Sequence, residues 1–124
     1  MGAIMAKALG IGGIFFRSAD TKALAAWYLD HLGVGGIGHD PWPQAAGPTV
    51  FAPFKANTDY FPADRQYMLN FRVDDIAALI TQLQSAGISV ETRAEWDGDW
   101  GTFARIHDPE GNPIELWQEP PAKA

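Results

Sequence analysis

Residues 71–79 of this 124-residue chain read FRVDDIAAL, and residues 16–24 read FRSADTKAL. The Phe, Arg, Asp and Leu of the two stretches recur at a constant offset of 55 residues, from 16 to 71. An internal repeat indicates two similar units that bury their apolar faces together. We therefore expect a single domain over residues 1–124, with modules at about 10–63 and 64–119 and a short tail at 120–124.

A helix is predicted after the repeated motif in each module. In the second module, apolar residues at spacings of three and four form one stripe, which comprises Ile76, Leu79, Ile80 and Leu83. Asp74 or Asp75 is the expected N-cap, and Gly87 the expected stop. The first module has a looser version of this helix, with a cap at Ser18 or Asp20 and a stop at Gly33.

Strands are predicted on both sides of these helices, at 12–17, 49–54, 67–73, 88–93, 102–106 and 114–118. The second half therefore reads strand–helix–strand–strand–strand. The first half reads as a looser copy, interrupted by a stretch at 34–48 that is rich in Gly and Pro. One helix covers only one face of a four-stranded sheet, so two such modules side by side leave a shared concave face for a ligand.

This module order resembles the vicinal oxygen chelate superfamily, the glyoxalase/bleomycin-resistance/dioxygenase group. The helix motif WYLDHLG at 27–33 and the ending DPEGNPIELW at 108–117 carry the resemblance, which covers about residues 12–118. It implies an α+β fold of two βαβββ modules that form a glyoxalase-like sheet with a concave ligand cleft. Two chains of this superfamily often pair module to module, and unpaired module edges favour pairing, so we expect a homodimer.

The resemblance also implies where a metal would bind. Metal-using members place His, Gln or Glu on the first strand of each module and further carboxylates on later strands. Here the first-strand positions fall on Gly13 and Met68, and residues 49–54 contain no acid. Glu115 matches the last ligand, but one carboxylate does not hold a divalent ion tightly. We expect no cofactor and no metal, with Glu115 as the one matching ligand if a divalent metal is present.

Strand alternation gives most of the candidate ligand-binding residues, and Phe51, Trp96 and Trp100 are added because they could supply an apolar wall. Because successive side chains point to opposite faces, Ile114 and Leu116 are assigned to the helix-packed face, and their neighbours point into the cleft. Arginine side chains there would recognise carboxylate or phosphate groups. As an alternative, Arg17 and Arg72 reach water or pair with Asp20 and Asp75. The full candidate set is Phe15, Arg17, Phe51, Met68, Asn70, Arg72, Trp96, Trp100, Phe103, Arg105 and Trp117.

Glu115 has two interpretations. As a catalytic residue it would be a general base that abstracts a proton α to a carbonyl, since desolvation raises the pKa of a carboxyl toward a useful value. Alternatively it pairs with Arg105 or Arg72.

Three functional hypotheses follow. The first is a protein that binds or sequesters a small, partly aromatic or anionic molecule without the family's metal, as resistance-type members do. The alternative is a glyoxalase-like, metal-dependent lyase, isomerase or dioxygenase that uses Glu115. The third is a dimeric interaction module whose aromatic residues form a subunit interface.

Composition narrows the partners further. The chain is 47% hydrophobic, carries a formal net charge of -6 and has no cysteine. An acidic chain without a basic stripe disfavours nucleic acid and anionic membranes as partners. The lack of cysteine removes disulfides and thiol nucleophiles and fits a reducing compartment. No apolar run approaches the ~20 residues that span a bilayer, so we expect a cytoplasmic protein. His39, in the Gly/Pro stretch, is a further residue that could fold over the cleft.

Overall fold

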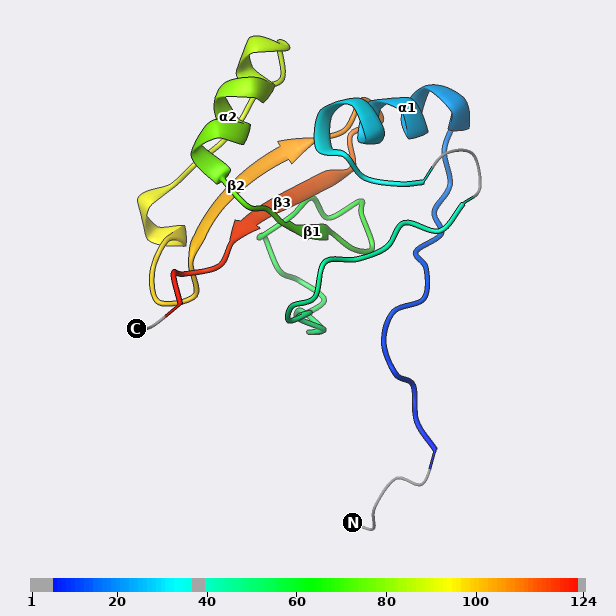
Figure 1. The fold of residues 1–124 in the computed structure, drawn as a ribbon, viewed down its shortest axis with the longest axis horizontal. Helices are drawn as coiled ribbons and strands as arrows, with labels where there is room; N and C mark the ends of the chain where they lie inside the picture. The colour runs from blue at the N-terminus through cyan, green and yellow to red at the C-terminus, as the bar shows by residue number, and fades with distance from the viewer. Residues whose placement is uncertain (1–5, 37–39, 123–124) are drawn as a thin grey trace.

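The computed structural model describes residues 6–36 and 40–122, so His39 lies outside the described residues. The element order is α1 (Thr21–Leu32), β1 (Leu69–Arg72), α2 (Ile76–Ser85), the short 3-10 helix η1 (Ala94–Trp96), β2 (Thr102–His107) and β3 (Pro113–Gln118). Figure 1 shows both α-helices on one side of the sheet, with the segment that precedes β1 on the other side. The fold is therefore mixed α+β, with a small sheet and two helices.

The sheet has the order β1-β3-β2, with β3 in the centre. β1 runs parallel to β3, and β2 runs antiparallel to it. The pairing places Asn70, Glu115 and Arg105 side by side across the three strands. The next row on the same face comprises Arg72, Trp117 and Phe103. Because side chains alternate along a strand, both rows point away from the helices.

Both helices begin and end close to the predicted residues. Asp20 caps α1 by accepting a 3.1 Å hydrogen bond from the amide of Ala23, and Asp75 caps α2 in the same way at 3.0 Å from Ala78. Gly33 follows α1 in the left-handed conformation, with φ of 66°, which costs glycine no side-chain strain. Equivalent capping in both copies supports the repeat at the level of its helices.

The hydrophobic core lies between the helices and one face of β2 and β3. Four strand residues on that face are fully buried, and helix residues pack against them; the core comprises Leu24, Tyr28, Ile76, Leu83, Ala104, Ile106, Ile114 and Leu116. The predicted alternation is thus confirmed for β2 and β3. It sends their remaining side chains to the opposite face of the sheet.

The turn between β2 and β3 ties α1 to the sheet. Asp108 is 4% exposed. Its Oδ2 accepts hydrogen bonds from the hydroxyl of Tyr28 on α1 and from the side-chain amide of Asn112, both at 2.7 Å. Its Oδ1 accepts from the backbone amides of Glu110 and Asn112 at 2.8 and 3.0 Å. Because a buried carboxylate needs such donors, the DPEGN turn has one defined geometry.

Three predicted strands are wrong for the described residues. Residues 12–17 and 49–54 form no strand there, and residues 88–93 are reduced to a single bridge between Glu91 and Arg105. A strand needs a partner as well as a suitable sequence, and neither first-half segment pairs with the free edge of β1. The second four-stranded unit that the repeat predicts is therefore not seen among the described residues. None of the described helices is long and apolar enough to cross a membrane.

Candidate functional site

The centre of the helix-free face carries a polar row, which is Asn70, Glu115 and Arg105. Glu115 lies between the other two on the central strand β3. Its Oε1 accepts a 2.7 Å hydrogen bond from the side-chain amide of Asn70. Its Oε2 accepts a hydrogen bond from the hydroxyl of Tyr60, which reaches it from the loop before β1. Both carboxylate oxygens are therefore engaged.

Arg105 is enclosed by aromatic rings. The residue is only 7% exposed. Its guanidinium carbon lies 4.9 Å from the ring centre of Tyr60 and 5.6 Å from that of Trp96, which are cation–π distances. Its Nη2 donates to the backbone carbonyl of Tyr60 at 2.8 Å, whereas its Nε has no hydrogen-bond partner. A buried, unpartnered donor is uncommon and points to a functional group or a missing partner.

Tyr60 thus connects the polar row to the loop that precedes β1. Burial, together with the hydrogen bond to the Glu115 carboxylate, raises the pKa of the Tyr60 hydroxyl to about 12. The hydroxyl therefore stays protonated at physiological pH and donates a hydrogen bond to Glu115. Its ring also meets the edge of Trp96, with 6.2 Å between ring centres.

A cavity of about 550 Å³ opens beside this cluster. Its aromatic wall is Tyr60, Phe61 and Trp96, and Arg105 also borders it. Glu91 and Arg93 lie on its rim and form a 2.8 Å ion pair with each other. The volume suits a small organic molecule, and aromatic faces beside a few polar groups are typical of such sites.

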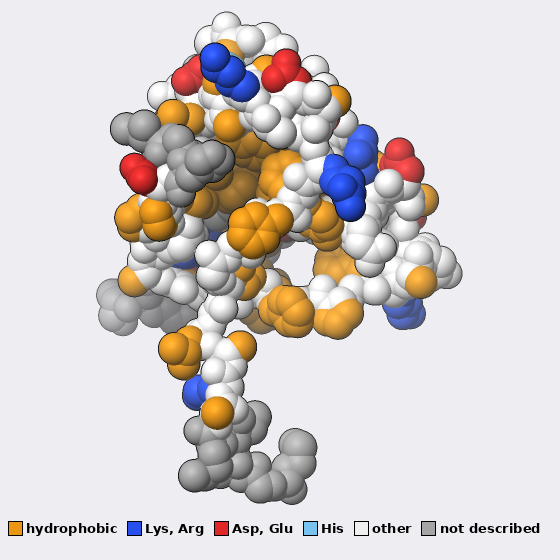
Figure 2. All heavy atoms as spheres, turned by 90° about the vertical axis from the view of Figure 1, so that its right-hand side faces the viewer, with side chains coloured by type: hydrophobic (Ala, Val, Ile, Leu, Met, Phe, Trp, Pro, Cys, Tyr) orange, Lys and Arg blue, Asp and Glu red, His pale blue; other side chains and the backbone are white. Residues whose placement is uncertain are grey.

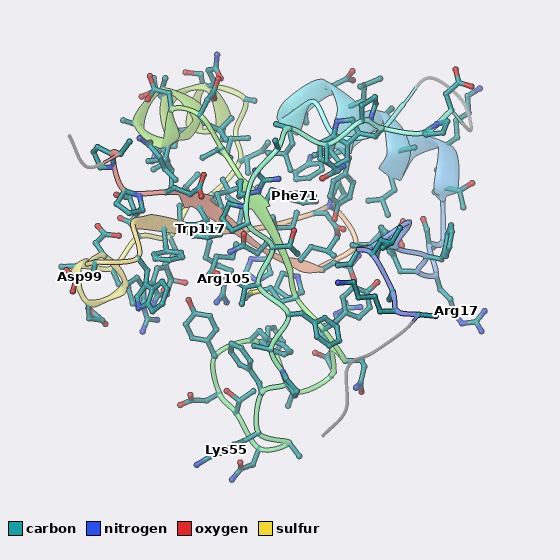
Figure 3. The ribbon with its side chains drawn as sticks, turned by 60° about the horizontal axis from the view of Figure 1, so that its bottom comes forward. Arg17, Lys55, Phe71, Asp99, Arg105 and Trp117 are labelled. Atoms are coloured by element: carbon teal, nitrogen blue, oxygen red, sulfur yellow. The ribbon has the colours of Figure 1, made fainter. Side chains whose placement is uncertain are left out.

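The predicted site residues divide into three groups. Trp96 and Arg105 border the cavity, and Asn70 and Glu115 adjoin it through Tyr60. Figure 3 shows Arg105 near the middle of the sheet and Arg17 projecting at the far side of the molecule. The proposed pairing of Glu115 with an arginine is not formed among the described residues, whose one ion pair is Arg93–Glu91.

A second group lies on the same face but away from the cavity. Phe103 and Trp117 stack on each other with nearly parallel rings 6.2 Å apart. The indole N–H of Trp117 donates to the carbonyl of Trp100, whose own side chain is 78% exposed. Arg72 donates to the carbonyls of Ala45 and Ala46 at 2.8 and 3.3 Å and thereby holds the incoming loop.

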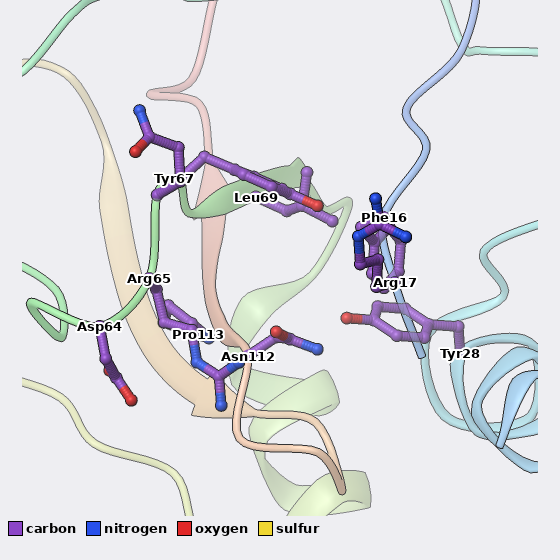
Figure 4. A pocket seen from close by; sticks show the side chains of 10 residues that line it. Phe16, Arg17, Tyr28, Asp64, Arg65, Tyr67, Leu69, Asn112 and Pro113 are labelled. Carbon is purple, nitrogen blue, oxygen red and sulfur yellow. The ribbon is translucent and has the colours of Figure 1, made fainter. Parts of the chain in front are cut away.

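The third group does not reach this cavity. Phe15 and Phe51 are 94% and 88% exposed, and Met68 is half-buried outside the cavity lining. Arg17 instead borders a smaller cavity of about 200 Å³ between Tyr28, Arg65 and Tyr67 (Figure 4). The sheet register predicted for residues 12–17 would have brought Phe15 and Arg17 to the cleft, but no strand forms there.

The sequence analysis missed Tyr60. The signal for it was the repeat itself, because Tyr60 and Glu115 are separated by the same 55 residues as the two FR motifs. Tyr60 is thus the first-half counterpart of Glu115. Its position outside any predicted strand hid this relation.

The residues around Glu115 do not fit the metal that the superfamily implies. Its neighbours are an amide, a phenol and a guanidinium cation, and both of its oxygens accept hydrogen bonds. A divalent ion needs several carboxylate or imidazole ligands, and a nearby cation opposes its binding. No group of three such ligands occurs anywhere in residues 6–36 and 40–122.

A cavity lined by aromatic and polar groups thus lies beside a small mixed sheet in an α+β domain. The model of the glyoxalase-like domain family matches residues 13–117, and the chain belongs to that family. This assignment confirms the resemblance to the vicinal oxygen chelate superfamily.

Similar solved structures include TnmS3, an antibiotic-binding protein from Streptomyces sp. CB03234, with 28% identity over 82% of this chain and 88% of that chain and a TM-score of 0.47. A glyoxalase/bleomycin resistance protein from the same organism has 28% identity, covers 81% and 92% of the two chains, and has a TM-score of 0.46. TioX from Micromonospora sp. ML1 has 13% identity, covers 86% and 94%, and has a TM-score of 0.49. No curated protein matches the sequence.

Proposed function

We propose that this glyoxalase-like domain binds, and thereby sequesters, a small and partly aromatic molecule in the cavity beside Tyr60, Trp96 and Arg105, without a metal. The proposal rests on the surroundings of Arg105. This buried cation lies within cation–π distance of two aromatic rings and borders a cavity of about 550 Å³. Sequestration is also how resistance-type members of this fold act.

The chemistry of the cavity favours an aromatic ring that carries an anionic or polar substituent. Trp96 offers an aromatic ring for stacking, and such a contact is worth about 0.5–1.5 kcal/mol per pair beyond the area that it buries. Arg105 retains an unpartnered N–H that an oxygen atom of the ligand would satisfy after a local movement. A guanidinium group is suited to carboxylate because it stays charged and presents its N–H groups in one plane.

The alternative, a metal-dependent lyase, isomerase or dioxygenase that uses Glu115, has less support. Both oxygens of the Glu115 carboxylate already accept hydrogen bonds from side chains of the protein, so neither oxygen is free to accept a proton from a substrate in this arrangement. The donor set around it does not suit a divalent ion. Glu115 is therefore proposed as an orienting acceptor.

Calorimetric titration of the EDTA-treated protein with 2-naphthoate tests the proposal. Binding at micromolar to millimolar concentration is expected, with about two- to tenfold weaker affinity for Trp96→Ala because a lost stacking contact removes about 0.5–1.5 kcal/mol. Leu29→Ala is the matched control, since Leu29 is a 44% exposed apolar residue on α1 that does not border the cavity. Absence of binding by the wild type, or stoichiometric binding of Ni²⁺, Mn²⁺, Zn²⁺ or Fe²⁺, would contradict it.

We also propose that two copies of the chain associate through the first half. Figure 2 shows hydrophobic side chains gathered around a hollow on one face of the molecule. The exposed apolar residues of the first half include Ile14, Phe15, Val50 and Phe51, and β1 leaves one edge unpaired. Unpaired edges beside exposed apolar segments favour strand addition by a partner. Light scattering should give a dimer mass for the wild type and a monomer mass for Phe51→Asp.

A further inference from the structure

We propose that Tyr60 is a built-in plug of the ligand site: its phenol occupies the position of a hydroxylated aromatic ring of the ligand, which displaces it on binding. This inference rests on the proposed function and deepens it, because it names the class of ligand. The proposed function alone does not say whether Tyr60 is a fixed wall of the cavity or an occupant that leaves.

The contacts of Tyr60 are those that a phenolic ligand would make. Its hydroxyl donates to the Glu115 carboxylate, its ring lies against the Arg105 cation, and the same ring packs edge-to-face with Trp96. All three partners come from outside its own loop. A single side chain of the chain therefore engages both charged groups of the polar row at once.

The plug is held to the sheet by few bonds. Tyr60 lies in a segment without helix or strand, and its amide bonds locally to the hydroxyl of Thr58 at 3.2 Å. In Figure 3 the loop that carries it, with Lys55 at its tip, extends below the sheet face that bears Arg105. Within the described residues, the phenol of Tyr60 meets the sheet through one hydrogen bond to Glu115 and the contact of its ring with the Arg105 cation, and its backbone carbonyl accepts one hydrogen bond from Arg105. A phenolic ligand that donates to Glu115 and places its ring against Arg105 replaces both contacts of the phenol with contacts of the same kind, so displacement has a small net cost.

With Tyr60 in place, one buried hydrogen-bond donor of the polar row also has no partner. Arg105 Nε is buried and has no partner while Tyr60 is in place. An unsatisfied buried donor costs free energy that an oxygen atom of an entering ligand would recover. The polar row thus favours an aromatic ligand that donates one hydrogen bond to Glu115 and offers one acceptor to Arg105, as a phenol or enol with a neighbouring carbonyl does.

The raised pKa of Tyr60 fits this role. A phenol that stays protonated matches a ligand hydroxyl that donates to a carboxylate. It also predicts that a compound with a methoxy group in place of the hydroxyl will lose the contact with Glu115.

The test compares the Kd of 2-naphthol and of 2-methoxynaphthalene, by calorimetry on the EDTA-treated protein. Tyr60→Ala is expected to bind 2-naphthol about tenfold more tightly than the wild type, which corresponds to one recovered hydrogen bond. Tyr60→Phe is expected to improve binding by a smaller factor, because it frees Glu115 but keeps the ring. The matched control is Tyr67→Ala, since Tyr67 is a 42% exposed tyrosine outside this cavity.

Three outcomes separate the two proposals. If Tyr60→Ala or Tyr60→Phe weakens the binding of 2-naphthol, Tyr60 is a wall; the plug is overturned while the proposed function stands. If the wild type binds 2-naphthoate but no form prefers 2-naphthol to 2-methoxynaphthalene, the phenolic class is wrong and the function again stands. If no form binds any of these aromatic probes, both fail. Should Tyr60→Ala not fold, as checked by circular dichroism, Tyr60→Phe decides.

A second readout follows the plug directly. The chain has three tyrosines, so labelling with 3-fluorotyrosine gives three fluorine resonances. Addition of 2-naphthol to the wild type should move the Tyr60 resonance toward the position of a solvent-exposed tyrosine. If the Tyr60 resonance instead moves away from the position of a solvent-exposed tyrosine, the ring has become more buried on binding, and the plug is overturned.

Discussion

The second half of the chain, residues 64–119, builds a core, whereas the first half, residues 10–63, contributes one helix to it. Only Leu24 and Tyr28 of the core cluster come from the first half, and both lie on α1. Yet the first half is also apolar and aromatic, and its Phe15 and Phe51 are almost fully exposed. The difference teaches that apolar content alone does not bury a segment. Regular spacing and a hydrogen-bonding partner are required as well.

The largest effect is expected from a core substitution in the second half. Leu116 is fully buried at the centre of the sheet, so Leu116→Ala should lower the free energy of unfolding by about 2–5 kcal/mol. Urea denaturation measures it. In the first half, Phe51→Ala should cost less than about 0.5 kcal/mol in dilute protein, with an effect that grows as copies associate. If Phe51→Ala lowers the free energy of unfolding as much as Leu116→Ala at every protein concentration, the two halves do not differ as described.

A buried hydrogen bond from Tyr28 to Asp108 links the two halves. Tyr28→Phe removes a donor from a carboxylate that is 4% exposed, so it should destabilise the fold by about 1–2 kcal/mol. Thermal unfolding followed by circular dichroism measures the change. Tyr67→Phe is the control and should be close to neutral, because no hydrogen bond of its hydroxyl is formed in the described structure. If Tyr28→Phe and Tyr67→Phe change the thermal stability by the same amount, the hydrogen bond from Tyr28 to Asp108 does not contribute measurably to stability.

Alkaline pH should weaken the loop that carries Tyr60. The hydroxyl has a pKa of about 12 in the folded chain, against an ordinary value of 10.0. Its neutral form is therefore favoured by folding, so this stabilisation is fully present below pH 10 and is lost as the pH rises through about 12. Because Tyr60 is partly exposed, the effect is smaller than the pKa alone suggests. The stability difference between the wild type and Tyr60→Phe should shrink over this interval; a constant difference would contradict the assignment.

The smallest effect is expected at the entrance of α1. The half-buried Glu110 accepts hydrogen bonds through its carboxylate from the hydroxyl of Ser18 at 2.7 Å and from the amide of Ala19 at 2.8 Å. These bonds lower the pKa of Glu110 below its ordinary value of 4.5. Its contribution is therefore present above pH 4.5 and is lost as the pH falls through the lowered value. Glu110→Gln should lower the melting temperature slightly at pH 7 and leave it unchanged at strongly acid pH. A loss that persists in acid would point to another cause.

Local signals in the sequence were sufficient for the helices and for the face of the sheet that they cover. The caps Asp20 and Asp75 act within three residues, so no distant partner is needed to predict them. The same holds for the alternation along β2 and β3, where Ala104, Ile106 and Ile114 are fully buried.

What the sequence did not predict depends on distant partners. Strands at 12–17 and 49–54 require an edge with which to pair, and β1 is not paired with them in the described structure. Arg17 consequently borders a different cavity from Arg105. Tyr60 joins the site from an irregular loop, and hydrophobic periodicity contains no information about such a contact. The absence of a family metal and the location in the cytoplasm stay predictions.

The account rests on one site, the cavity that Trp96 and Arg105 border. Its most direct test is a nitrogen–proton correlation spectrum of the EDTA-treated protein during titration with 2-naphthoate. The five tryptophan indoles give separate reporters. We predict that the indole signal of Trp96 and the guanidinium signal of Arg105 shift with the ligand, while the indole of Trp27 on α1 does not. Shifts confined to residues of the smaller cavity around Tyr28 and Tyr67, or no shift at all, would contradict the account.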